Sequence, residues 1–211
     1  MELKLNLLVK NLYGGDGNIR YIEEKQVKFS RTKSKKTKKM NIDVSTENLT
    51  GEESSEMVKR EIQTFKMNNG KPTYRFGGIH GKMWGHLRAS GKMLADLGVE
   101  GFDSKAFIDR IMMSVNITPI ELTIENHKPI EVAEIPQITA GISKALIIQK
   151  FDYIPECKVQ MTLQFPEMYL ERVLKILKQA ESLAGMNKRR AEIKVLNRKE
   201  VFGKEEQDNT N

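Results

Sequence analysis

The sequence has very little cysteine, few aromatic residues and no long apolar run. Its 211 residues include a single cysteine, Cys157, and one tryptophan. One cysteine excludes an internal disulfide bond and any zinc site built from several cysteines. No stretch reaches the roughly 18 to 20 continuous apolar residues of a membrane helix, and the alternating start of the chain is not typical of a signal peptide. We therefore expect no membrane partner and, by default, a cytoplasmic location.

Acidic residues are fewer than basic ones. The chain has 35 Lys and Arg against 28 Asp and Glu, a net charge of +7 and a pI of about 9.3. Two clusters contain many of the basic residues: Arg31, Lys33, Lys35, Lys36, Lys38 and Lys39 in the first, and Lys188, Arg189 and Arg190 in the second. A single run of charge can be a solvated loop, but two clusters favour a polyanionic partner such as a nucleic acid.

Hydrophobic periodicity predicts strands and helices in a mixed order. Strict alternation indicates half-buried strands, and apolar residues three or four apart indicate helices. The predicted core elements are a strand at 2–10, a helix at 79–97 closed by Gly98, a strand within 111–125 broken at Pro119, a strand at 157–165, a helix from Pro166 to Gly185 and a strand at 191–195. A further helix is expected near 103–110. Ile79 is expected on the apolar stripe of the first helix.

This order predicts an α+β fold of the ferredoxin-like (RRM-like) βαββαβ type with two large insertions. The single domain would span residues 1–202, with insertions at 13–73 and 126–156 and a disordered tail at 203–211. Within the first insertion, residues 53–66 could form a short amphipathic helix. The second insertion is expected to be a protruding hairpin or a long loop. The other face of the sheet, or the insertions, would be left for a ligand.

A glycine-rich stretch before the first helix is the leading candidate for RNA binding. Glycines allow close approach of a ligand, and a helix N-terminus offers free N–H groups and partial positive charge. The candidate residues in and around it are Arg75, Gly78, His80, Gly81, Lys82, Trp84, Arg88 and Lys92. The alternative is a tight strand-to-helix turn whose cations are merely solvated. Trp84 could stack a base or pack in the core.

Catalytic and metal-binding signals are weak. His80 and His86 lie six residues apart, so on a helix they point about 240° away from each other and do not converge on one phosphate. Each is expected to pack or to hydrogen-bond RNA. We expect no cofactor and no metal site, since no tight Asp, Glu and His cluster is present. Asp43 is either an ordinary surface aspartate or the acid of a nuclease. Cys157 should be buried and inert.

Two segments resemble motifs of the RAMP superfamily, the ferredoxin-like RNA-binding proteins of CRISPR systems. Residues 76–88 are similar to its "G-s-s-h-K-G-h-h-R" signature, with Gly78, Gly81, Lys82, Gly85 and Arg88 in a similar register. Residues 183–193 resemble its glycine-rich turn into the last strand. This chain departs from that pattern where Ala191 and Glu192 follow Arg190 in place of glycines. The resemblance covers about residues 1–12 and 74–198.

Among these proteins the chain most resembles the backbone subunit, the "Cas seven" type. The resemblance implies a non-catalytic subunit that polymerises along guide RNA in an antiviral effector complex and presents it for pairing with target RNA or DNA. It implies copies of itself and other CRISPR effector subunits as partners, and a thumb formed by the second insertion. Two alternatives stay open. One is a metal-dependent endoribonuclease subunit that cuts bound target RNA with Asp43, and the other is a stand-alone RNA-binding protein.

Overall fold

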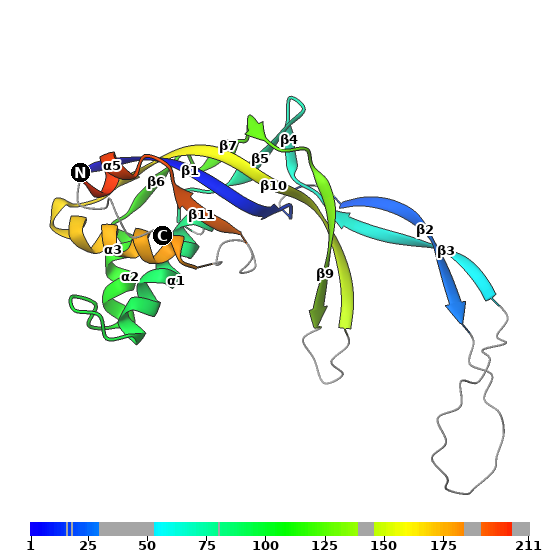
Figure 1. The fold of residues 1–211 in the computed structure, drawn as a ribbon, viewed down its shortest axis with the longest axis horizontal. Coiled ribbons are helices and arrows are strands. Elements are labelled where there is room, and N and C mark those ends of the chain that lie inside the picture. The colour runs from blue at the N-terminus through cyan, green and yellow to red at the C-terminus, as the bar shows by residue number, and fades with distance from the viewer. Residues whose placement is uncertain are drawn as a thin grey trace, which may run out of the picture.

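The structure, a computed structural model, describes residues 1–15, 17, 19–29, 53–79, 81–138, 146–183 and 191–203 (Figure 1). It is a mixed α+β fold with one large sheet and a separate sheet of three strands. The longer helices lie together on one face of the large sheet, and two long hairpins extend from the end of the sheet away from these helices (Figure 1).

Four strands form the part of the large sheet that carries the helices: β1 (Glu2–Tyr13), β6 (Asn116–Thr118), β10 (Leu146–Gln164) and β11 (Glu192–Val195). β1 pairs antiparallel with β11 on one side and with β10 on the other, and β10 pairs antiparallel with β6. The spatial order is therefore β11–β1–β10–β6. Because every neighbour is antiparallel, β1 runs parallel to β6 and β10 runs parallel to β11.

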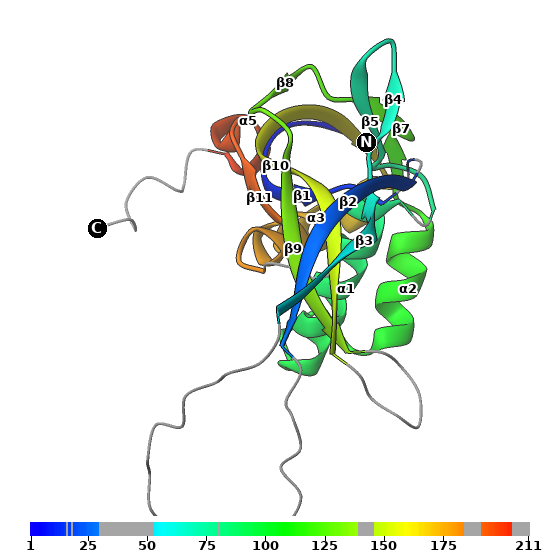
Figure 2. The same cartoon turned by 90° about the vertical axis from the view of Figure 1, so that its right-hand side faces the viewer.

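The two parallel pairs, β1 with β6 and β10 with β11, are each connected through helices. These helices cover the same face of the large sheet (Figures 1 and 2). Helices α1 (Lys82–Asp96) and α2 (Lys105–Met113) lie between β1 and β6 in the chain, and η1 (Glu167–Tyr169) with α3 (Leu170–Glu181) lies between β10 and β11. A short helix, α5 (Arg198–Phe202), follows β11 and contacts β1.

The alternation of polarity explains this core. The buried side chains of the strands face the helices: Leu5, Leu7 and Val9 of β1; Val159, Met161 and Leu163 of β10; Ile193 and Val195 of β11. The buried side chains of the helices pack against them: Met83, Leu87 and Leu94 of α1; Val173, Ile176 and Leu177 of α3. The predicted strands at 2–10, 157–165 and 191–195 are confirmed, as are the helices near 79–97 and 103–110. The helix predicted from Pro166 to Gly185 is also present, and it comprises a first turn, η1, followed by α3, which ends at Glu181. Gly98, with φ of 67°, ends α1 as expected.

Some boundaries differ from the prediction. Ile79 lies before α1 and its side chain is 56% exposed, so its expected place on the buried stripe is wrong. The predicted strand within 111–125 begins late, because α2 continues to Met113. Pro119 does interrupt it, and separates β6 from β7 (Glu121–Thr123).

The first insertion contains a long hairpin. β2 (Ile19–Phe29) and β3 (Glu53–Gln63) pair along their full length, and we call them the first arm. The expected helix at 53–66 is therefore wrong, because residues 53–63 complete their backbone hydrogen bonds with β2. The chain then forms β4 (Lys66–Asn68) and β5 (Lys71–Arg75), which pair with each other, and β5 pairs with β7 in the small sheet.

The second insertion is a protruding hairpin, as expected. After β8 (Asn126–His127), β9 (Glu131–Ile138) pairs with the first half of β10, from Leu146 to Tyr153. We call this hairpin the second arm. β10 is 19 residues long, and at Lys150 it lies between β9 and β3. Both arms thus continue from strands of the large sheet and project away from the helices (Figure 1).

Candidate nucleic-acid interface

The glycine-rich turn before α1 is packed tightly against the loop between β6 and β7. The amides of Gly77 and Gly78 donate to the carbonyls of Ile120 and Ile117, at 3.1 and 3.0 Å. A Cβ on Gly77 would lie 2.4 Å from the Ile117 and Pro119 carbonyl oxygens, and one on Gly81 would lie 2.1 Å from the Gly77 oxygen. The structure therefore explains these two glycines by close packing of the turn on itself and on the β6–β7 loop.

Two of the predicted RNA-binding cations on α1 are engaged within the protein. Arg88 donates from Nε and Nη2 to the two carboxylate oxygens of Asp109 on α2, at 2.6 and 3.0 Å, and Lys92 Nζ lies 3.0 Å from the same carboxylate. Hydrogen bonds from Arg88 and Lys92 lower the pKa of Asp109 to about 2. Part of the positive charge of Arg88 and Lys92 is therefore already neutralised within the protein.

Trp84 and His86 belong to the core. The Trp84 side chain is 8% exposed and its indole Nε1 donates to the Met112 carbonyl at 2.9 Å, so of its two alternatives, base stacking and core packing, the structure shows core packing. His86 is 2% exposed and its Nε2 lies 2.9 Å from the Ala180 carbonyl. Burial lowers the pKa of His86, which favours the neutral ring. Of the two alternatives for His86, packing is the one observed.

Among the described residues, Lys82 and Arg75 are the predicted cations that form no ion pair with a described carboxylate. Lys82, the first residue of α1, is half-buried and makes no ion pair with a described residue. Arg75 is exposed and reaches the Ile79 carbonyl at 3.4 Å. Gly78, with φ of 70°, makes the bend between them. These three residues lie at the β6 edge of the sheet, where the turn contacts Ile117.

Several predicted residues lie outside the described part of the chain, and their assignments stay predictions. They are the basic cluster Arg31, Lys33, Lys35, Lys36, Lys38 and Lys39, the cluster Lys188, Arg189 and Arg190, together with His80 and Asp43. Residues 204–211 also lie outside it. Cys157, by contrast, is described, and it is buried with a pKa raised to about 12, mainly by burial, as expected for an inert thiol.

The face of the large sheet opposite the helices carries mainly polar side chains. They alternate with the buried residues of the same strands: Lys4, Asn6, Leu8 and Lys10 of β1; Lys158, Gln160, Thr162 and Gln164 of β10; Glu192 and Lys194 of β11; Asn116 and Thr118 of β6. We call this surface the open face. It carries no aromatic side chain on these positions, so a ligand there would be held by charge and hydrogen bonds rather than by stacking.

Neighbouring hollows lie along the open face. One of about 580 Å³ is lined by residues that include Lys4, Asn6, Thr118 and Gln160. Another of about 440 Å³ shares Asn6 and Gln160 with it and reaches Lys158. The first hollow also includes Pro119, the residue against which the glycine-rich turn packs. The open face and the exposed edge with Lys82 thus meet at the β6–β7 loop.

The alternation at 2–10 and 157–165 already placed Lys4, Asn6, Lys10, Lys158 and Gln160 on the side opposite the buried residues. That signal was sufficient to predict a polar sheet face. What the sequence did not provide was the register, which sets Asn6 opposite Gln160 and Leu8 opposite Lys158. For this reason none of these residues was among the predicted RNA-binding positions.

Comparison with protein-family models, with curated proteins and with solved structures found no match to this chain. Among the described residues, no three His, Cys, Asp or Glu side chains are grouped so that they could hold a metal ion. In the same part of the chain, no helix has the length and apolar character needed to cross a membrane.

Proposed function

We propose that the protein is an RNA-binding backbone subunit of a CRISPR effector complex, built on a ferredoxin-like core. The observation that carries the proposal is the strand order β11–β1–β10–β6 with two interleaved crossovers. In a split βαβ unit each helix connects two parallel strands that are separated by one antiparallel strand. The connections from β1 to β6 and from β10 to β11 have this form, with α1 and α3 on the same face.

The two arms support the assignment to the backbone type. The resemblance implies a ferredoxin-like core with one insertion after its first strand and a second that forms a thumb. The first arm follows β1 in the chain, and the second arm precedes the core half of β10. Both are hairpins that extend beyond the helical part of the molecule (Figure 1). We assign the thumb to the second arm.

Charge and surface chemistry support RNA as the ligand. The net charge of +7 favours a polyanion. The open face offers lysines and amide side chains, and Lys82 adds a cation at its β6 edge. Phosphate contacts of this kind bind without regard to sequence and weaken as salt rises. A subunit that covers any guide RNA requires binding with these properties. Such a subunit would act in the cytoplasm, with guide RNA, target RNA or DNA, other effector subunits and copies of itself as partners.

Expression together with the native guide locus tests the proposal. The protein would be purified, the co-purified nucleic acid sequenced and the mass of the particle measured. We expect short RNAs of one repeat–spacer type in a particle that contains several copies of the chain. A monomer free of nucleic acid would overturn the proposal. A monomer on RNA of mixed sequence would favour the stand-alone RNA-binding protein instead.

A further inference from the structure

Three lysines surround one leucine on the open face. Leu8 of β1 lies directly opposite Lys158 of β10 and directly opposite Lys194 of β11. Lys10 is two residues further along β1 and therefore points to the same face. Leu8 is half-buried, whereas Lys10, Lys158 and Lys194 are exposed. Leu8 is thus flanked on the same face of the sheet by three exposed lysines, Lys10, Lys158 and Lys194, which we call the lysine triad.

The lysine triad is not neutralised by ion pairs. Lys10, Lys158 and Lys194 make no hydrogen bond or ion pair with any described residue, unlike Arg88 and Lys92. Two glutamates do lie near Lys10, since Glu156 and Glu192 are opposite it on the neighbouring strands. Glu156 is itself 3.9 Å from Lys128 Nζ. Positive charge therefore remains in excess around Leu8.

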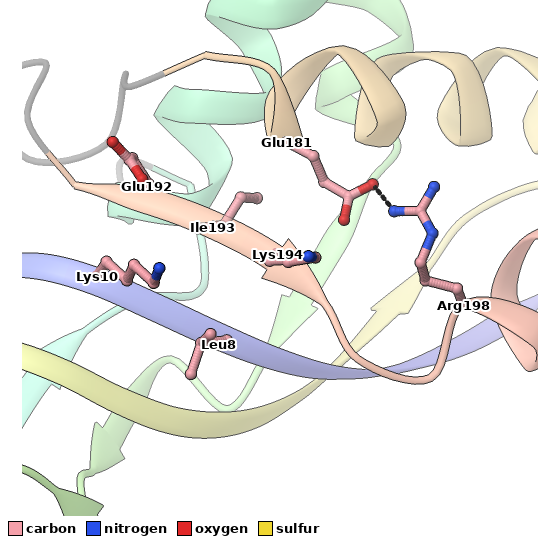
Figure 3. A pocket seen from close by; sticks show the side chains of 7 residues that line it. All are labelled: Leu8, Lys10, Glu181, Glu192, Ile193, Lys194 and Arg198. Carbon is pink, nitrogen blue, oxygen red and sulfur yellow. Dashed lines mark hydrogen bonds and ion pairs between the residues drawn. The ribbon is translucent and has the colours of Figure 1, made fainter. Parts of the chain in front are cut away.

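The edge strand that carries Lys194 is held firmly in place. Glu181, at the end of α3, accepts a hydrogen bond from the Val195 amide at 2.7 Å and pairs with Arg198 at 2.5 Å. Figure 3 shows this pair beside Lys194, with Leu8 and Lys10 on the adjacent strand. A hollow of about 290 Å³ is lined by these residues together with Glu192 and Ile193. The backbone positions of the triad are thus fixed by the sheet and by Glu181.

We infer that Leu8 and the lysine triad form a nucleotide subsite for single-stranded RNA on the open face. The lysines contact backbone phosphates, and a ribose or base lies against Leu8. Charge complementarity selects this occupant, because three cations without ion-pair partners on adjacent strands suit a flexible polyanion. The inference rests on the RNA-binding function proposed above and adds a surface remote from the glycine-rich turn.

A pair of matched variants tests the subsite on the full chain. The first carries Lys10→Gln, Lys158→Gln and Lys194→Gln. The control carries Lys71→Gln, Lys105→Gln and Lys175→Gln, which removes the same charge from lysines paired with Glu125, Asp96 and Glu171. Both would be titrated against a fluorescein-labelled 20-nucleotide polyuridine RNA by anisotropy over a series of salt concentrations. Circular dichroism would establish that each variant is folded.

We expect the triad variant to bind at least about tenfold more weakly near physiological salt, with the salt slope reduced by about 2, since each single-strand phosphate contact contributes about 0.7. The control should stay within about threefold of the wild type. A further variant, Leu8→Ser, should weaken binding with an unchanged salt slope, because it removes an apolar contact and no charge.

Other outcomes separate the subsite from the proposed function. Equal losses in the triad and control variants, with a wild type that binds RNA, would overturn the subsite and leave the proposed function intact. A wild type that neither binds the probe nor co-purifies with RNA would overturn both. If the triad substitutions change the oligomeric state in the absence of RNA and not the affinity for the probe, the surface contacts protein and the inference is wrong.

Discussion

Arg88 on α1 donates two hydrogen bonds to Asp109 on α2, at 2.6 and 3.0 Å. Lys92 reaches the same carboxylate one turn further along α1. Asp109 thereby connects α1 with α2 and stabilises their packing. It also neutralises part of the charge of Arg88 and Lys92, which are then less able to bind an anionic ligand. These two roles have opposite consequences for an Asp109→Asn variant.

We expect Asp109→Asn to lower stability and to raise affinity for RNA. The folded-state pKa of Asp109 is about 2, below its ordinary value of 3.8. A depressed carboxyl pKa stabilises the fold above the unfolded-state value, and this stabilisation is lost as pH falls from about 4 to about 2. The variant should therefore show a lower Tm at pH 7 and a smaller loss of stability on acidification. Its RNA affinity should rise, because Arg88 and Lys92 are released.

Asp96→Asn is the matched control, since Asp96 on α1 pairs with Lys105 on α2 at 2.8 Å and both side chains are more than half exposed. It removes the same charge but does not involve Arg88 or Lys92. Thermal unfolding and RNA titration of both variants would separate the local effect from the change in net charge. Equal RNA affinities in the two variants would contradict the view that Asp109 restrains these cations.

The Arg88–Asp109 pair also illustrates what the sequence could and could not provide. Alternation and helical spacing predicted β1, α1, α3 and β11, because the buried side chains alone determine those patterns. The role of Arg88 depends on a carboxylate 21 residues away on another helix, and that of Trp84 depends on a carbonyl of α2. No local pattern encodes such contacts.

The first arm was harder to predict for a related reason. Residues 53–63 have apolar positions, Met57, Val58 and Ile62, at helical spacing, yet they form β3. Their backbone groups pair with β2, and only Ile62 and its neighbour Gln63 pair with β10. In a two-stranded hairpin the hydrophobic pattern is a poor predictor of secondary structure, because few of the side chains of such a strand pack against a core.

Two glycines of the resembling motif should respond oppositely to alanine. Gly81→Ala would place a Cβ 2.1 Å from the Gly77 carbonyl oxygen in a buried turn. We expect this substitution to lower the free energy of unfolding by about 1–3 kcal/mol, as substitutions that overpack a protein core do. Gly85 lies within α1, where a Cβ meets nothing within 4 Å. Gly85→Ala should stabilise the protein by about 0.5–1 kcal/mol, since glycine is unfavourable inside a helix.

Urea unfolding of both glycine variants would measure these changes, and each serves as the control for the other. A stable Gly81→Ala protein would show that the turn can shift, and that packing does not explain the glycine. A loss of stability in Gly85→Ala would contradict the view that this helix surface is open.

His86 should make stability depend on pH below neutrality. Burial lowers its pKa from the ordinary value of 6.5. The unfolded chain therefore binds a proton more readily than the folded one, so stability falls as pH drops below about 6.5, by at most about 1.4 kcal/mol per pH unit for one proton. His86→Gln should flatten this dependence, because glutamine can donate to the Ala180 carbonyl and does not titrate.

Urea titrations at several pH values between 7.5 and 5 would measure the slope in the wild type and in His86→Gln. His127→Gln, which removes the partly exposed histidine of β8, is the control for the loss of an imidazole. The assignment would be refuted by identical slopes in the wild type and in His86→Gln.

Asn197 extends the sheet beyond the end of β11. Its Oδ1 accepts from the Asn6 amide at 2.9 Å, and its Nδ2 donates to the Lys4 carbonyl at 3.0 Å and to Glu200 at 2.9 Å. The side chain thus takes the place of a strand residue beside β1 and links it to the Glu200 carboxylate of α5. Asn197→Ala leaves the Asn6 amide without this partner. We expect the free energy of unfolding to fall by about 1–2 kcal/mol.

Hydrogen exchange at the Asn6 amide gives the sharper measurement, because it reports the broken bond directly. The amide should exchange faster in Asn197→Ala, whereas the Leu8 amide, within the paired part of β1, should change less. Asn126→Ala is the control, since the Asn126 side chain makes no hydrogen bond to a described residue although it lines the same hollow as Asn197. Unchanged protection of the Asn6 amide would contradict the assignment of the Asn197 side chain as its hydrogen-bond partner.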